Sequence, residues 1–187
     1  MRRVVVTGLG IVSSIGNNAS EVLESLKAGR SGITANEDMK EYGFRSQIAG
    51  DIKGLSLADM IDKRTLRFMG PGAAYAYLAM EQAIADAGLD QSLVSNERTG
   101  LVAGSGGPST SSMFAAHQVV LKAGSPKRIG PLAVPKCMSS TISANLSTAY
   151  KIKGINYSIT SACSTSLHCI GNAAEQIMMG KQDVMFA

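Results

Sequence analysis

Apolar residues follow two alternating patterns along this chain. Short β-branched or continuous apolar runs at 3–7, 99–103, 155–160 and 181–187 predict buried strands. Between the later runs, apolar residues recur every three or four positions, which is typical of helices with one buried face. Strands alternating with helices in this way predict an α/β fold with a mostly parallel sheet covered on both faces.

The clearest helix covers residues 73–88. Its apolar positions are spaced by four, three, four and three residues, and Gly88 ends it; they are Ala73, Tyr77, Met80, Ile84 and Ala87. Further helices are predicted at 111–122, 140–151 and 164–179.

The first part of the chain gives weaker signals. Asn18, with Glu21 three residues later, predicts the N-cap of a helix that ends at Gly29. Residues 30–70 are expected to be irregular. Pro131 and Pro135 are expected to bracket a short extended piece.

Length and ending suggest one structural unit within a larger fold. The 187 residues can bury one sizeable core. The final apolar run begins a strand and stops without a turn, a cap or a polar tail. We therefore expect residues 1–187 to be one half of a larger fold, truncated at the start of a strand.

Composition narrows the functional classes. The chain is 45% hydrophobic and 17% charged, with a net charge of +4 that is too weak and too scattered to predict nucleic-acid binding. No apolar run is long enough to cross a membrane. Three cysteines, an odd number, and no signal peptide predict free thiols in a reducing, cytoplasmic location.

Cys163 is the candidate of greatest chemical interest, because it lies between a predicted strand and a predicted helix. A thiol reacts as its thiolate, and the positive end of a helix favours that form. The amides there could form half of an oxyanion hole for a thioester carbonyl. Small residues in the helix would let it pack deeply and turn its N-terminus toward a buried cleft; they are Ser164, Ser166, Gly171, Ala173 and Ala174. The alternative is that Cys163 is a small core residue.

The other cysteines and the two histidines give no second catalytic group. Cys169 lies inside the predicted helix and Cys137 has no base beside it, so both are interpreted as packing residues. His168 is interpreted as a hydrogen-bonded structural residue, and His117 as exposed or lining a pocket. A complete Cys–His site is therefore not visible in this chain.

Several segments together resemble the N-terminal half of the β-ketoacyl-(acyl-carrier-protein) synthases, the condensing enzymes of fatty-acid synthesis, and most of all the type I synthases of bacterial dissociated systems. The segments are VVVTGLGIVSSIGN, LVAGSGG, YSITSACSTSLHCIGNAAEQI and GKQDVMFA. The resemblance implies that Cys163 is the nucleophile. It also implies a thiolase-like fold, with two similar α/β halves in layers α-β-α-β-α, and a homodimer.

The resemblance also implies a reaction. The thiolate would take an acyl chain from the phosphopantetheine thioester of acyl carrier protein, and malonyl carrier protein would then lose CO₂ and attack the acyl-enzyme. No metal or diffusible cofactor is implied. The two histidines and the lysine that the family uses come from its C-terminal half, so the chain alone is expected to be inactive.

Two further sets of residues receive roles from the resemblance. Gly107, in the GSGG segment, would leave room for the acyl chain. Two basic stretches could dock the acidic carrier protein, although solvated charged faces are the ordinary alternative; they comprise Lys63, Arg64 and Arg67, and Lys127 and Arg128.

Three rival interpretations remain. A hydrolase with a nucleophile elbow is disfavoured, because Ser161 and Thr165 occupy the places where that motif has glycine. The chain could instead be a non-catalytic piece that binds its missing half and exposes apolar surface when alone. It could also belong to a thiolase-fold condensing enzyme that uses coenzyme A thioesters.

Overall fold

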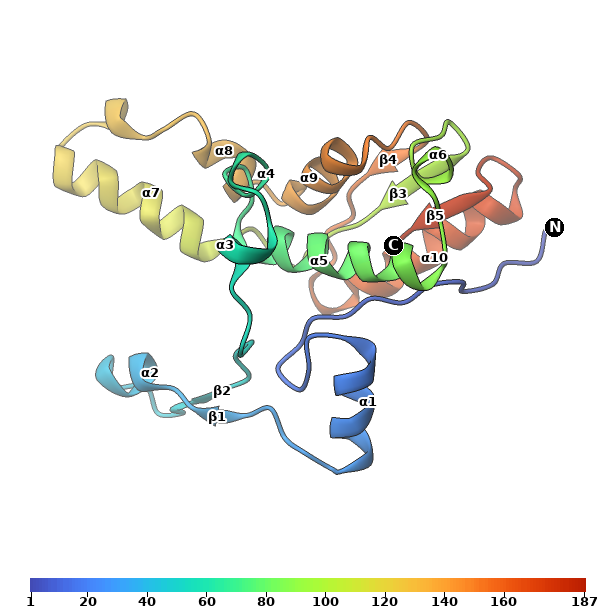
Figure 1. The fold of residues 1–187 in the computed structure, drawn as a ribbon. Helices are drawn as coiled ribbons and strands as arrows, with labels where there is room; N and C mark the ends of the chain where they lie inside the picture. Colours follow the sequence, from blue (N-terminus) through green and yellow to red (C-terminus); the bar gives the residue numbers. More distant parts are fainter.

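A parallel three-stranded sheet lies at the centre of the computed structural model, which describes all 187 residues (Figure 1). The strand order is β4 (Asn156–Tyr157), β3 (Thr99–Val102), β5 (Val184–Phe186), and both pairings are parallel. In the register, Leu101 pairs with Asn156 on one side and with Phe186 on the other. The predicted parallel sheet and α/β class are confirmed.

Helices cover the two faces of this sheet. The connections from β3 to β4 and from β4 to β5 run in opposite directions, so right-handed crossovers place α9 (Thr141–Tyr150) and α10 (Thr165–Met178) on opposite faces. The long helix α5 (Pro71–Asp86) packs against α9.

The remaining elements are shorter or lie further from the sheet. They are α1 (Ala19–Lys27), β1 (Thr34–Ala35), α2 (Glu37–Glu41), β2 (Ile48–Ala49), α3 (Leu57–Met60), α4 (Lys63–Leu66), α6 (Gln91–Val94), α7 (Thr110–Ala123), η1 (Pro126–Arg128), α8 (Ala133–Cys137) and η2 (Ala162–Ser164). In Figure 1, α7 extends away from the sheet, and the chain then returns to α8, which lies near α9.

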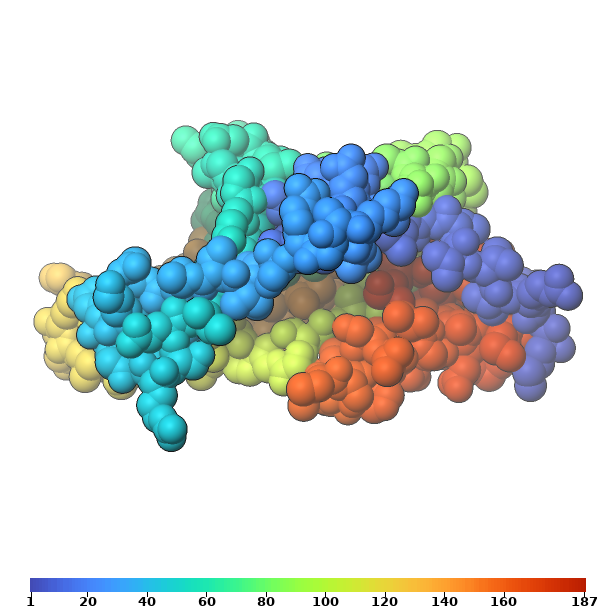
Figure 2. Space-filling model, turned by 90° about the horizontal axis from the view of Figure 1, so that it is seen from below, coloured from blue at the N-terminus to red at the C-terminus, as the bar shows by residue number.

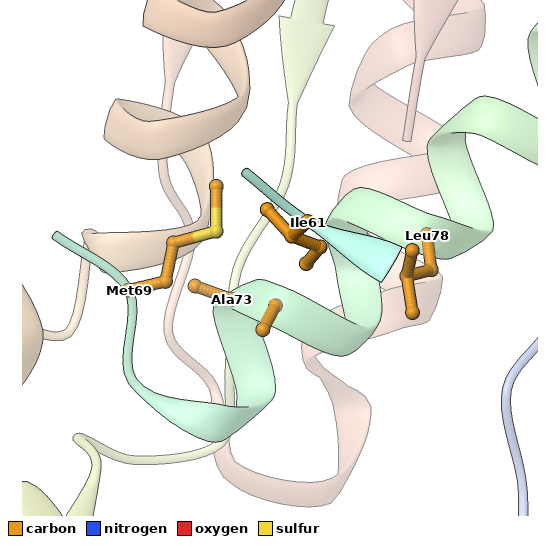
Figure 3. Close-up of a cluster of buried hydrophobic side chains, with 5 residues drawn as sticks. Ile61, Met69, Ala73 and Leu78 are labelled. Carbon is orange, nitrogen blue, oxygen red and sulfur yellow. The ribbon is translucent and has the colours of Figure 1, made fainter. Parts of the chain in front are cut away.

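The core has two parts that meet along α5. One contains Met80 of α5, Leu101 and Ala103 from β3 and the residue after it, and Leu146 of α9. The other gathers on the opposite part of α5, against the segment before it (Figure 3); its members are Ile61, Met69, Ala73, Ala74 and Leu78. The predicted stripe on residues 73–88 contributes to both parts, Met80 to the first and Ala73 to the second, while Ala74 and Leu78 are buried outside the stripe.

The predicted helices are all confirmed, with ends that differ by one or two residues. The side chain of Asn18 accepts from the N–H of Glu21 at 3.0 Å, as expected for the N-cap of α1. Gly29 and Gly88 follow their helices with positive φ, +61° and +64°, which glycine adopts without strain. No helix is both long enough and apolar enough to cross a membrane.

The predicted strand at residues 3–7 is wrong. This segment is extended but pairs with no strand, and Val5 and Val6 are 67% and 85% exposed. Further along it, two backbone N–H groups donate instead to side chains of α5: Leu9 to Asp86 at 2.9 Å and Ile11 to Gln82 at 3.1 Å. An apolar, β-branched run therefore forms no ladder here because no strand lies beside it.

Two other expectations about irregular segments need correction. Residues 30–70 contain the short elements β1, α2, β2, α3 and α4. The piece between Pro131 and Pro135 is not extended, since α8 begins at Ala133. Pro135 fits because it lies in the first turn of α8, where its missing N–H would have no helical partner.

An open apolar cleft of about 590 Å³ lies between the first residues, α5, α10 and β5. Its lining includes Val4, Val6, Ala83, Ile170, Ile177 and Phe186. Figure 2 shows the end of the chain, in dark red, recessed between the violet first residues and the orange-red α10. The sheet side next to β5 is therefore only partly covered.

Candidate active site

Cys163 lies in the one-turn 3-10 helix η2, directly before the 14-residue helix α10. Its side chain is exposed. The predicted position at the positive end of a helix is thus observed, where the dipole and free amides favour an anion. The sulfur is therefore accessible to a substrate and is not a core residue in this chain.

The expected buried cleft at the N-terminus of this helix is not observed. Helix α10 buries only one face, which carries Thr165, Cys169 and Ala173. Ser166 and Gly171 are exposed, and so are the larger Leu167 and Ile170, at 73% and 54%. The small residues therefore do not draw the helix deep into the molecule, because nothing in this chain packs on its other face.

The backbone around Cys163 is tightly turned. Ala162 has a φ of +46°, a left-handed conformation that a residue with a Cβ rarely adopts. Ser164 closes the turn, since its N–H and its hydroxyl both donate to the carbonyl of Ser161, at 3.1 and 2.7 Å. Strain of this kind occurs at functional sites and persists only where the surroundings hold it.

Only some of the backbone N–H groups in the turn have a hydrogen-bond acceptor. The N–H of Ser164 donates to the carbonyl of Ser161, and the N–H of Thr165 donates to that of Ala162. The N–H of Cys163 donates to neither carbonyl. An unused amide beside the sulfur suits a developing oxyanion, as half of the donor pair that such a site needs.

Glycines after β3 bring a second loop against this turn. A Cβ on Gly104 would lie 1.8 Å from the carbonyl oxygen of Ile159, and one on Gly106 would lie 3.0 Å from that of Ala162. Close backbone approach therefore requires glycine at position 104 and leaves little room for a side chain at position 106. A Cβ on Gly107 would meet nothing within 4 Å, so its role beside an acyl chain stays a prediction.

The sequence did not reveal which glycines support Cys163. The GSGG segment indicated only that backbone comes close to something there, and the contact is with the chain before Cys163. Thr165 was noted only as the wrong residue for an elbow motif, yet it is 4% exposed and hydrogen-bonded to the turn. A polar residue two positions after the candidate nucleophile was the available signal.

The remaining cysteines agree with packing roles. Cys169 is 2% exposed, and burial raises the pKa of its thiol, which keeps it protonated. Cys137 ends α8 and is half-buried.

The histidines do not complete the site. His168 is exposed and its imidazole makes no hydrogen bond, so its predicted structural role is wrong. His117, on α7, is exposed as predicted, and its imidazole also has no partner. No group of three or more His, Cys, Asp or Glu side chains is arranged to hold a metal ion.

The predicted docking residues are all exposed and none forms an ion pair in the structure. Lys63 and Arg64 open α4, which Asp62 caps by accepting from the N–H groups of Arg64 and Thr65. The guanidinium of Arg67 lies 5.2 Å from the ring centre of Phe68. Lys127 and Arg128 lie in η1, at the far end of α7.

Comparison with known proteins identifies relatives that match the whole chain. The chain is 56% identical to 3-oxoacyl-(acyl-carrier-protein) synthase 1 of Haemophilus influenzae and 53% identical to that of Escherichia coli K12. Both alignments cover the whole chain but 46% of the relative, so the chain spans about half the length of these proteins.

Solved structures with a similar fold are also ketosynthases. A β-ketoacyl synthase from Burkholderia phymatum superposes with a TM-score of 0.83 at 32% identity, over 97% of this chain and 45% of that one. A ketosynthase solved in complex with a type II polyketide acyl-carrier protein shares the fold at 21% identity and a TM-score of 0.76, over 97% of this chain and 48% of that one. The fold is thus that of the N-terminal half of a thiolase-like ketosynthase.

The family model for the N-terminal domain of β-ketoacyl synthases matches residues 1–187. With a cysteine exposed in a strained turn at the start of α10, and with the whole chain matched, the protein belongs to the β-ketoacyl synthase family, whose N-terminal domain it carries.

Proposed function

We propose that this chain supplies the acyl-accepting half of a 3-oxoacyl-(acyl-carrier-protein) synthase of bacterial fatty-acid elongation. The observation that carries the proposal is the position of Cys163: exposed, in a strained turn, at the positive end of α10. The names of the relatives, which match the whole chain at 53–56% identity, support the same reaction.

The first half of the reaction uses residues of this chain. The thiolate of Cys163 attacks the carbonyl carbon of the acyl thioester, and the amide of Cys163 donates to the resulting oxyanion. Collapse of the tetrahedral intermediate breaks the bond to the phosphopantetheine sulfur, which leaves as a thiolate and can take up the proton that Cys163 released on ionising. The acyl group then remains on Cys163.

The second half needs groups that this chain does not place at the site. Malonyl carrier protein loses CO₂, and its carbanion attacks the acyl carbonyl and expels the thiolate of Cys163, giving a 3-oxoacyl product two carbons longer. In the family, two histidines and a lysine of the C-terminal half assist these steps. His117 and His168 are exposed, and their imidazoles make no hydrogen bond.

The partners follow from the same proposal. Acyl carrier protein delivers both thioesters on its own phosphopantetheine arm, so no diffusible cofactor is needed. The exposed, unpaired Lys63, Arg64, Arg67, Lys127 and Arg128 suit an acidic partner. We further propose a homodimer located in the cytoplasm, where the three free thiols would stay reduced.

Charge reversal tests the docking residues. In a protein that contains both halves, Lys63→Glu with Arg67→Glu should raise KM for acyl carrier protein and leave the reaction with a small acyl thioester unchanged. Lys40→Glu is a suitable control, because Lys40 is exposed on α2 and paired only with Glu37. Equal effects on both substrates would remove the docking role.

A condensation assay tests the proposed reaction and its division between two halves. The longer protein should form 3-oxoacyl carrier protein, and the isolated 187-residue chain should not. Normal turnover by the isolated chain would contradict this division. Faster acylation by coenzyme A thioesters than by carrier-protein thioesters would favour the related thiolase-fold enzymes.

One observation favours a second candidate, in which this chain acts as a binding half. Large apolar side chains are exposed on several elements, among them Val6 at 85%, Val134 at 71% and Phe114 at 63%. Surface of this kind marks a protein interface or an aggregation site. Light scattering that shows a well-behaved monomer of the isolated chain would argue against it.

A further inference from the structure

Thr165 holds the turn that carries Cys163, although the reaction above gives it no part. It is the first residue of α10 and is 4% exposed. Its hydroxyl oxygen accepts from the N–H of Ser161 and the hydroxyl donates to the carbonyl of Ala162, both at 2.8 Å. One side chain thus binds the peptide groups on both sides of the Ser161–Ala162 pair.

The residue that these bonds restrain is the strained one. Ala162 has a φ of +46°, and its carbonyl carbon is bonded directly to the nitrogen of Cys163. Any relaxation of Ala162 toward an ordinary conformation would rotate that peptide group. The N–H of Cys163, and with it the direction of the thiol, would then move.

A second segment lies close to the same carbonyl from outside the turn. A Cβ on Gly106 would come within 3.0 Å of the oxygen of Ala162 and 3.2 Å of its carbon. The carbonyl group therefore has both the hydroxyl of Thr165 and the backbone of Gly106 against it. A methyl group at position 106 would press on the group that the hydroxyl holds.

We propose that Thr165 is a positioning residue, whose hydroxyl fixes the peptide group before Cys163 and so sets the direction of the thiol and the amide of Cys163. The inference rests on the proposed acyl acceptance by Cys163 and adds the residue that maintains its geometry. It also explains why threonine suits the place where an elbow motif has glycine. In an elbow motif, glycine relieves the crowding because it has no side chain. Here the hydroxyl of Thr165 holds the turn through hydrogen bonds instead.

The test measures alkylation of Cys163 by iodoacetamide in the folded chain, followed by mass spectrometry of the peptide that contains it. Thr165→Val keeps the shape of the side chain and removes the hydroxyl, so the rate should fall about tenfold, as expected for a misplaced reacting group. Thr165→Ser keeps the hydroxyl and should recover most of the rate.

Thr141→Val is the matched control. Thr141 is 5% exposed and its hydroxyl also makes two hydrogen bonds, donating to the carbonyl of Pro135 at 2.6 Å and accepting from the side chain of Asn145 at 3.1 Å. Its loss should reduce stability similarly and leave the alkylation rate of Cys163 unchanged. A general effect of destabilisation would slow both valine variants.

Equal rates in Thr165→Val and the parent chain would overturn the proposal, and so would a serine variant as slow as the valine one. If Thr165→Val does not fold, Gly106→Ala replaces it, and an unchanged rate in that variant overturns the proposal. Alkylation needs neither carrier protein nor the histidines and lysine. A failed condensation assay would therefore leave this result standing.

Discussion

Strand β3 and the first ten residues are both short and apolar, but they differ greatly in how far their side chains are buried. All four residues of β3 are buried between β4 and β5, and Val102 is 0% exposed. In the first ten residues Val6 is 85% exposed, and the contact with α5 is made largely by backbone: a Cβ added to Gly10 would lie 1.8 Å from the carbonyl oxygen of Ala79.

The difference shows that the burial of an apolar segment depends on which elements pack against it, and not on its own residues alone. β3 has hydrogen-bonded strands on both sides and helices on both faces. The first residues have α5 on one side and the open cleft on the other. Cys163 follows β4, so the covered sheet positions the proposed nucleophile, while the open side leaves apolar surface exposed.

The largest expected difference in unfolding free energy is between alanine substitutions at two matched glycines, one just after β3 and one in the first ten residues. Gly104→Ala and Gly10→Ala each place a methyl group 1.8 Å from a backbone oxygen. The neighbours of Gly104 are fixed by the sheet, so its substitution should reduce the free energy of unfolding by about 3 kcal/mol, as strong overpacking does. The segment around Gly10 can shift, so its substitution should cost about 1 kcal/mol or less.

Urea unfolding of both variants measures the two losses. Equal losses would show that the first residues are held as firmly as the end of β3, and the comparison would fail. Gly107→Ala, which meets nothing within 4 Å, is the neutral control.

Substitution of one valine in each segment tests the same comparison, with a smaller expected difference in unfolding free energy. Val102→Ala deletes fully buried methyl groups and should lower the free energy of unfolding by about 2 kcal/mol. Val6→Ala deletes exposed ones and should change it by less than about 0.5 kcal/mol. Thermal or urea unfolding gives both values, and a loss at Val6 similar to that at Val102 would mean that the first residues are covered.

The smallest expected effect concerns Asp183, which both regions contact. Arg98, just before β3, donates from Nε and Nη2 to its two carboxylate oxygens at 2.9 and 2.8 Å, and Arg2 donates to one of them at 2.6 Å. These bonds, those of Arg98 first, lower the pKa of Asp183 from 3.8 to about 2.

A pKa that is lower in the folded state means that the stabilisation is complete above pH 3.8 and is lost as the pH falls toward 2. The difference in unfolding free energy between the parent and Asp183→Asn should therefore be constant at neutral pH and shrink between about pH 4 and pH 2. Because all three side chains are about half exposed, the difference will be small. A difference that grows on acidification would contradict the assignment.

Local patterns predicted much of this fold correctly. The spacing of apolar residues located α5, α7, α9 and α10, and the capping residues Asn18 and Gly29 located the ends of α1. These features depend on contacts within a few residues, so the sequence states them directly. The same holds for Cys163, whose position at the start of α10 follows from the residues around it.

The failures concern contacts between distant segments. Nothing in residues 3–7 states that no strand will lie beside them, and nothing in α10 states that Leu167 and Ile170 will remain uncovered. The role of Thr165 also depends on folding, because its hydroxyl meets the peptide groups of Ser161 and Ala162 only when the turn is formed.

The most direct test of the central claim is to find where an acyl group becomes attached. The protein is incubated with an acyl-carrier-protein thioester, digested, and examined by mass spectrometry. The account predicts one acyl adduct on the peptide containing Cys163, absent from Cys163→Ser. No adduct on Cys163 in the longer protein, or an adduct that persists on Cys137 in the serine variant, would contradict it.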